Sequence, residues 1–115
     1  SSLVSWAFRE NGWDVPFPSP STYNMSSVFT GLGFKRYDGN PAASDLVRGD
    51  IVLFEGDISA GTGHVELYLG DGMLVGAHIN EFGGVAGGQP GDQTGNEIST
   101  GGYYRSWNCW LRWEG

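Results

Sequence analysis

The spread of glycine along this chain restricts the folds that are open to it. The 115 residues include 20 glycines and five prolines, and these separate short apolar runs from one another. Both residue types mark turns, and neither suits the interior of a long helix. The pattern therefore predicts short strands joined by tight turns, and it disfavours a helical bundle.

The first third of the chain contains two helical patterns. Ser2–Glu10 carries apolar residues on one helical face and is followed by the stop signal Asn11-Gly12. The segment 15–20 holds three prolines and should be an extended linker. A second amphipathic helix is predicted from apolar residues at i, i+3, i+4 and i+7, which are Met25, Val28, Phe29 and Leu32.

Strand patterns follow these helices. Phe34–Tyr37 is a candidate short strand, and Ile51–Phe54 is an apolar run too short for a helix, so it predicts a central strand. Val65–Leu69 alternates, which predicts a packed face with Val65 and a polar face that includes His64, Glu66 and Tyr68. The class is therefore α+β, with strands dominating the second half.

The end of the chain is less regular. Met73–Ile79 is predicted as a strand after the turn Gly70-Asp71-Gly72, and Tyr103–Trp113 as the last strand. Between them, 80–102 is rich in glycine and small polar residues and is expected to be a long functional or irregular loop. The length fits one domain, 1–115.

Charge and cysteine content exclude several classes of protein. The formal charge is −7 with only six Lys and Arg residues, so nucleic acid is not an expected partner. Apolar stretches of membrane-spanning length and a signal-peptide pattern are both absent from the sequence. The single cysteine, Cys109, excludes an internal disulfide and a multi-cysteine zinc site.

The two histidines, His64 and His78, fall on strands that meet at one hairpin. A three-residue loop would pair Leu69 with Met73 and set His64 opposite His78 on the same face. A two-residue Asp71-Gly72 turn would pair Gly70 with Met73 and turn His78 to the other side of the sheet. Asp-Gly favours the second register, and both remain open.

His64 has the position expected of a catalytic base, because it follows the glycine-bounded stretch 56–63 and begins a polar strand face. A surface or core role is an equally good interpretation of His78. A metal site formed by His64, His78 and Glu66 is weakly supported, because the ligands show no tight spacing. No cofactor is expected.

Several segments in order resemble NlpC-type cell-wall cysteine peptidases and their CHAP relatives. The segment 44–54 resembles the family's "leucine, two residues, Gly-Asp, apolar strand" signature, and 64–70 its histidine strand. Ser1–Val4 resembles the residues after the nucleophile in the family motif Asp-Cys-Ser-small-Leu-Val. The segments 91–97 and 103–112 resemble the ending of a phage and prophage endolysin subgroup.

The resemblance implies a papain-like fold, with N-terminal helices packed on a central antiparallel sheet. It implies that His64 is the base and that the nucleophilic cysteine stands immediately before Ser1, at a helix N-terminus that favours the thiolate. Ser1 itself is disfavoured as nucleophile because the motif places it one residue too late. Cys109, set among aromatic residues, is expected to be buried packing.

One position departs from the family pattern. The third catalytic residue, twelve positions after the histidine, is usually His, Asn or Gln, but here it is Gly76. His78 is then the first candidate to orient His64, with Asn80 or a main-chain carbonyl as alternatives.

The expected function is hydrolysis of an amide bond in bacterial peptidoglycan, either in a peptide stem or between N-acetylmuramic acid and L-alanine. The expected partner is peptidoglycan, the expected location is the bacterial cell wall after secretion or release, and the expected state is a monomer without membrane insertion. The alternative is a wall-binding or structural derivative that lacks the nucleophile.

Overall fold

The computed structural model describes residues 2–15, 22, 24–56, 63–77 and 98–114. Within these residues lie two α-helices, one short 3-10 helix and a single antiparallel sheet of six strands. The helices are α1 (Ser2–Glu10) and α2 (Met25–Gly31), and the 3-10 helix is η1 (Ala43–Asp45). The strands are β1 (Phe34–Asp38), β2 (Ile51–Phe54), β3 (His64–Gly70), β4 (Met73–Ala77), β5 (Ile98–Gly102) and β6 (Cys109–Trp113).

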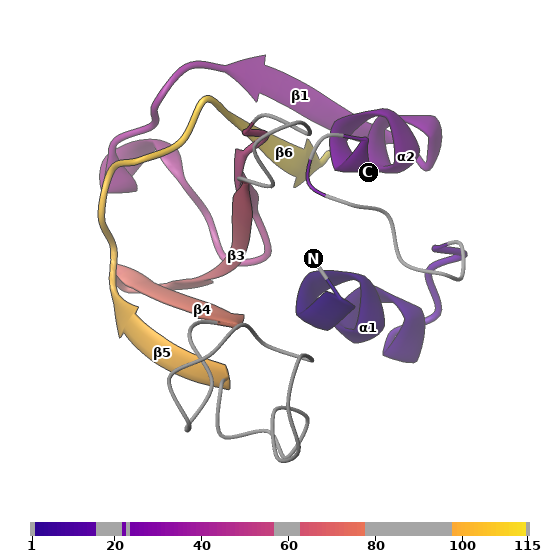
Figure 1. The fold of residues 1–115 in the computed structure, drawn as a ribbon, viewed down its shortest axis with the longest axis horizontal. Coiled ribbons are helices and arrows are strands. Elements are labelled where there is room, and N and C mark those ends of the chain that lie inside the picture. Colours follow the sequence, from indigo (N-terminus) through magenta and orange to yellow (C-terminus); the bar gives the residue numbers. More distant parts are fainter. Residues whose placement is uncertain (1, 16–21, 23, 57–62, 78–97, 115) are drawn as a thin grey trace.

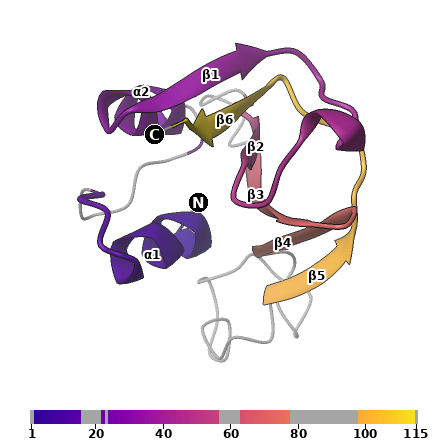
Figure 2. The ribbon, with the colours of Figure 1, turned by 180° about the vertical axis from the view of Figure 1, so that it is seen from behind.

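The strand order is β1-β6-β2-β3-β4-β5, so the last strand of the chain lies between β1 and β2 (Figures 1 and 2). The α+β class and both predicted helices are confirmed, as are the strands at 34–37 and 51–54. Two expectations for the last third were wrong. Residues 98–102, assigned to a loop, form strand β5, and the final strand begins at Cys109 instead of Tyr103.

Both helices lie on one side of a curved sheet, where α2 packs against β1 and β6 and α1 packs against β3 and β4 (Figure 1). The main core lies between these layers. Its buried apolar side chains come from both helices and from alternate positions of the central strands: Val4, Met25, Phe29, Phe34, Ile51, Leu53, Val65, Cys109 and Leu111.

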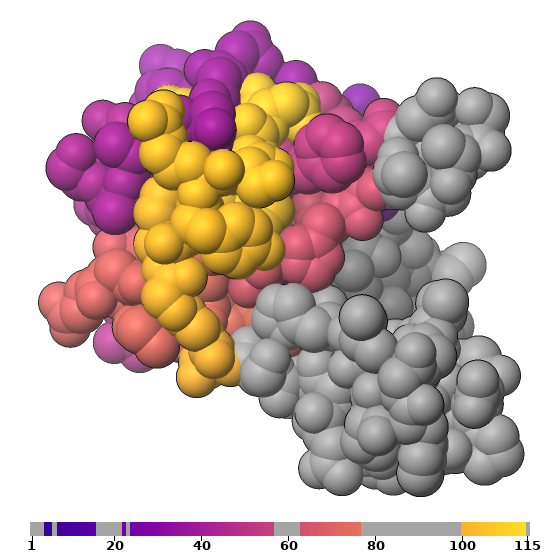
Figure 3. Space-filling model, turned by 60° about the vertical axis from the view of Figure 1, so that its left-hand side comes forward, coloured from indigo at the N-terminus to yellow at the C-terminus, as the bar shows by residue number. Residues whose placement is uncertain are grey.

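The other face of the sheet is also covered, which corrects the expectation of a polar face on β3. Glu66 is 1% exposed and Tyr68 is 5% exposed. A second cluster, formed by Leu46, Val52, Tyr68, Leu74 and Trp107, packs on this side. The cover comes from the chain before β2 and from residues 103–108, which belong to the C-terminal band in Figure 3. Alternation alone could not show this, because the covering segments lie far away in the sequence.

The Gly49-Asp50 signature has a structural reason. Gly49 adopts φ +97°, a conformation that favours glycine. Asp50 is 1% exposed and accepts hydrogen bonds from Arg112 Nη2 at 2.6 Å and from the main-chain N of Val47 at 2.9 Å. The hydrogen bond with Asp50 raises the pKa of Arg112 and joins the start of β2 to β6. A buried carboxylate needs such partners.

The hairpin between β3 and β4 combines the two predicted registers. Asp71 and Gly72 both have positive φ, and Gly70 pairs with Met73, as a two-residue turn requires. A bulge between Tyr68 and Gly70 then shifts the ladder, so Tyr68 pairs with Leu74 and Leu67 with Val75. Beyond the bulge, the pairing is therefore the one expected from a three-residue loop.

Candidate active site

His64 is the first residue of β3, and its side chain is 33% exposed. Its Nε2 atom lies 2.9 Å from Oε2 of Glu66, two residues further along the same strand face. Glu66 is a partner of the imidazole that was not identified from the sequence. The spacing of two residues on a strand was the available signal, because it places both side chains on one face.

Glu66 has a second partner on the same oxygen atom. The hydroxyl of Tyr104 donates a hydrogen bond to Oε2, while the carboxylate itself is buried. Burial, followed by this hydrogen bond, raises the pKa of Tyr104 above its ordinary value. The phenol therefore stays protonated near neutral pH and acts as the donor, as a buried carboxylate requires.

Gly76 gives Glu66 the room that it occupies. A Cβ atom at position 76 would lie 2.5 Å from Cγ of Glu66 and 2.7 Å from its Cδ. From the sequence, His78 or Asn80 was expected to orient His64 in place of the third catalytic residue that is missing at Gly76. Those two residues lie outside the described residues, and the position beside Gly76 is filled by Glu66.

The pairing with Glu66 distinguishes the two ring nitrogens of His64. An ionised carboxylate has no proton to give, so the nitrogen that faces it must be the donor. In that state Nε2 carries the hydrogen, and Nδ1 is the ring nitrogen without one. The arrangement fits a base that is oriented through Nε2 and acts through Nδ1.

Two aromatic residues are neighbours of His64. The ring of Trp107 stacks on His64 with 5.9 Å between centroids and 19° between planes, and Trp107 is 4% exposed. Phe54 pairs with His64 across β2 and β3 and is 42% exposed. The indole Nε1 of Trp107 donates to the main-chain oxygen of Tyr104 at 2.8 Å. The ring of His64 therefore has a rigid apolar neighbour and an exposed one.

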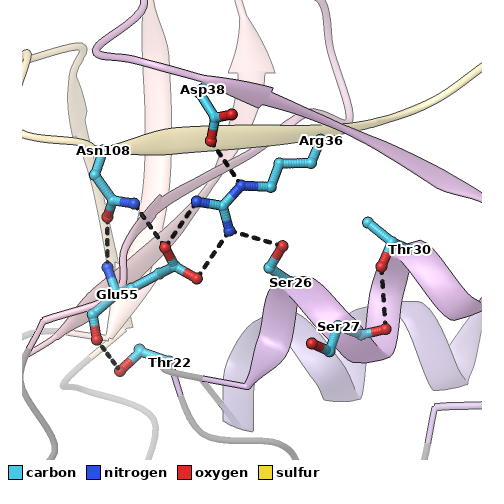
Figure 4. A network of polar contacts seen from close by, with 8 residues as sticks. All are labelled: Thr22, Ser26, Ser27, Thr30, Arg36, Asp38, Glu55 and Asn108. Atoms are coloured by element: carbon cyan, nitrogen blue, oxygen red, sulfur yellow. Dashed lines mark hydrogen bonds and ion pairs between the residues drawn. The ribbon is translucent and has the colours of Figure 1, made fainter.

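A second polar network fixes the chain next to this site (Figure 4). Arg36 makes two hydrogen bonds of 2.9 Å to the carboxylate of Glu55 and one to Ser26 of α2. Asn108 accepts from the main-chain N of Glu55 at 2.7 Å and donates to its carboxylate at 2.7 Å. The hydrogen bond from Arg36 is the main reason why the pKa of Glu55 lies below its usual value. Asn108 follows Trp107, so this network also anchors the residue next to the stacked ring.

The side chain of His64 lies on the sheet face of Tyr68 and Trp107, whereas α1 packs on the face of Val65. His64 is the first residue of β3. A nucleophile near the start of α1 would therefore have to approach the imidazole around this end of the strand, because the sheet separates the two faces. Ser1 lies outside the described residues.

Cys109 is not a nucleophile in this arrangement. The residue is fully buried in the main core, and burial raises the pKa of its thiol to about 11. The expectation that it serves as packing is confirmed. Among the described residues, no group of three or more His, Cys, Asp or Glu side chains could hold a metal ion. Nor does any helix in the described part of the chain have the length and apolarity to cross a membrane.

Comparison with known families gives a match for the last part of the chain. Residues 74–115 are similar to the family model described as an endolysin-like domain. The matched segment is less than half of the chain and contains Gly76, Tyr104 and Trp107, but it does not include His64 and Glu66. No curated protein matches the chain. The C-terminal part of the chain, with strands β4 to β6, is thus similar to an endolysin-like domain.

Proposed function

We propose that this chain is the main part of a papain-like, NlpC-type hydrolase that cleaves an amide bond in bacterial peptidoglycan. The observation that carries the proposal is the hydrogen-bonded pair of His64 and Glu66, which gives the imidazole a fixed orientation. The similarity of residues 74–115 to an endolysin-like domain supports a role at the cell wall. The acidic chain would act there as a monomer without membrane insertion.

In the proposed reaction, the nucleophile is the cysteine that the family motif places immediately before Ser1. Nδ1 of His64 takes the thiol proton, and the thiolate attacks the amide carbonyl. The carbon–nitrogen bond then breaks, and His64 returns the proton to the leaving amine. Water hydrolyses the resulting thioester and releases the carboxylate. Glu66 stabilises the imidazolium that exists between these steps.

The test uses the protein with the residues that its gene encodes upstream of Ser1. Purified peptidoglycan should yield new amino groups without new reducing ends. His64→Gln and replacement of the upstream cysteine by alanine should each abolish this release. Glu66→Gln should lower it by roughly 10²–10⁴-fold, the range for positioned acid–base groups. Release of reducing ends would mean a glycosidase and would refute the reaction class.

A second candidate function is a wall-binding derivative without catalysis. It is favoured by one observation, the position of the His64 side chain on the sheet face opposite to α1. This candidate predicts that the extended protein sediments with purified peptidoglycan sacculi but releases no amino groups. In that case His64→Gln would leave binding unchanged.

A further inference from the structure

Tyr104 lies in a segment whose position does not depend on its own hydroxyl. The preceding Tyr103 donates its main-chain N–H to the oxygen of Gly72 at 2.7 Å. Trp107 is held through its main-chain N by Asn40 and packs its ring against that of Tyr104, with 5.1 Å between centroids. The phenol ring is therefore placed by its neighbours, and its oxygen is brought to the carboxylate of Glu66.

The hydrogen-bond partner of the Tyr104 hydroxyl is a buried carboxylate. The residue as a whole is 42% exposed, whereas the carboxylate that accepts from its hydroxyl belongs to a residue that is 1% exposed. It meets Oε2, the same oxygen that faces Nε2 of His64. Two donors at one oxygen fix the rotation of the carboxylate about its last bond, because each donor has a preferred direction of approach.

We infer that Tyr104 is a positioning residue, which acts through Glu66 to hold the imidazole of His64 in the tautomer with hydrogen on Nε2. The side chain that fixes a histidine tautomer normally bonds the nitrogen that does not react. Tyr104 acts one contact further from the imidazole, because it holds the carboxylate of Glu66 that faces Nε2. The inference rests on the proposed function for its effect on turnover, while the tautomer itself is a property of the resting protein.

The test is Tyr104→Phe, which removes a single oxygen atom and keeps the ring between Trp107 and Glu66. Nitrogen NMR of protein labelled with ¹⁵N-histidine reports which ring nitrogen carries the hydrogen. The chain has two histidines, so the signals of His64 are those that disappear in His64→Gln. The unmodified protein should show hydrogen on Nε2, and Tyr104→Phe should show both tautomers in exchange.

Turnover of soluble peptidoglycan fragments gives a second measurement. Tyr104→Phe should lower kcat roughly 10–100-fold, as is typical for partners of an orienting side chain, and leave KM unchanged. The matched control is Tyr103→Phe. Tyr103 lies next to Tyr104 in the chain, and its hydroxyl donates to the main-chain oxygen of Pro41. This control should keep both the tautomer and kcat.

The outcomes separate this inference from the proposed function. An unchanged tautomer in Tyr104→Phe would overturn the inference even in an active hydrolase, and so would an equal change in Tyr103→Phe. If the unmodified protein cleaves no peptidoglycan but Tyr104→Phe alone mixes the tautomers, the positioning role stands and the proposed function fails. A lower melting temperature with an unchanged tautomer would show a structural role only.

Discussion

At the scale of single residues, the site depends on a match between a side chain and an empty space. Glu66 reaches His64 because Gly76 has no Cβ to occupy the same volume. From the sequence, His64 was predicted to be the catalytic base, and Gly76 stood out as a departure from the pattern of the NlpC-type peptidases that the sequence resembles. The link between the two was not predictable, because the contact between Glu66 and Gly76 depends on the register of the hairpin.

This match leads to a prediction for Gly76→Ala. The new methyl group would meet Cγ of Glu66 at 2.5 Å, inside a buried region, so the carboxylate must move away from His64. We expect a loss of stability of about 1–3 kcal/mol, the usual cost of overpacking, and a loss of turnover. Urea unfolding and the assay of released amino groups measure these effects.

Gly101→Ala is the control for this experiment. Gly101 lies on the neighbouring strand β5, and a Cβ there would have no atom within 4 Å. This variant should stay within about 0.5 kcal/mol of the unmodified protein. Equal behaviour of the two variants would contradict the role assigned to Gly76.

At the scale of elements, the helices and the central strand were predictable because their signals are local. The helix at Ser2–Glu10 shows its apolar face and its stop signal within a short stretch of sequence. Strand β5 was missed because its sequence, Ile98–Gly102, ends in two glycines and has little strand propensity. Its pairing with β4 gives it a strand conformation that its own residues do not specify.

The network around Glu55 leads to a prediction about pH. Because Arg36 lowers the pKa of Glu55 below its ordinary value of 4.5, the ion pair stabilises the folded state above that pH. The contribution is lost as the pH falls through the lower, folded-state pKa. Glu55→Gln should therefore lower the unfolding free energy at pH 7, by about 1 kcal/mol for a partly exposed pair, and by less at pH 3.

Urea unfolding of both proteins at several pH values between 7 and 3 measures this difference. Asp14→Asn is the control, because Asp14 is an exposed carboxylate. The unfolding free energy of Asp14→Asn should be close to that of the unmodified protein at every pH between 7 and 3. If Glu55→Gln lowers the unfolding free energy by the same amount at pH 7 and at pH 3, the charge of Glu55 contributes nothing to stability.

At the scale of the whole molecule, β2 carries the two cores on its opposite faces. Leu53 belongs to the main core between sheet and helices, and Val52 to the cluster on the other side, and both are fully buried. Because β2 contributes side chains to both cores, the stability of each core depends on the other. The prediction of one domain over 1–115 therefore implies one unfolding transition.

Leu53→Ala and Val52→Ala test this coupling. Leu53→Ala should cost about 2–5 kcal/mol, and Val52→Ala somewhat less because fewer carbon atoms are removed. Each variant should shift the far-UV and near-UV circular dichroism transitions together. Two separate transitions in either variant would show that the cores unfold independently and that the single-domain prediction is wrong.

The bulge in the β3–β4 hairpin has a consequence for how such a chain can change over generations. It lets a two-residue turn coexist with the register that brings Glu66 beside Gly76. Gain or loss of one residue between Gly70 and Met73 would alter which residues of β4 face His64, although the altered codon lies far from the site. We therefore expect hairpin length, Glu66 and Gly76 to be inherited as one unit, so that a lineage changes all three or none.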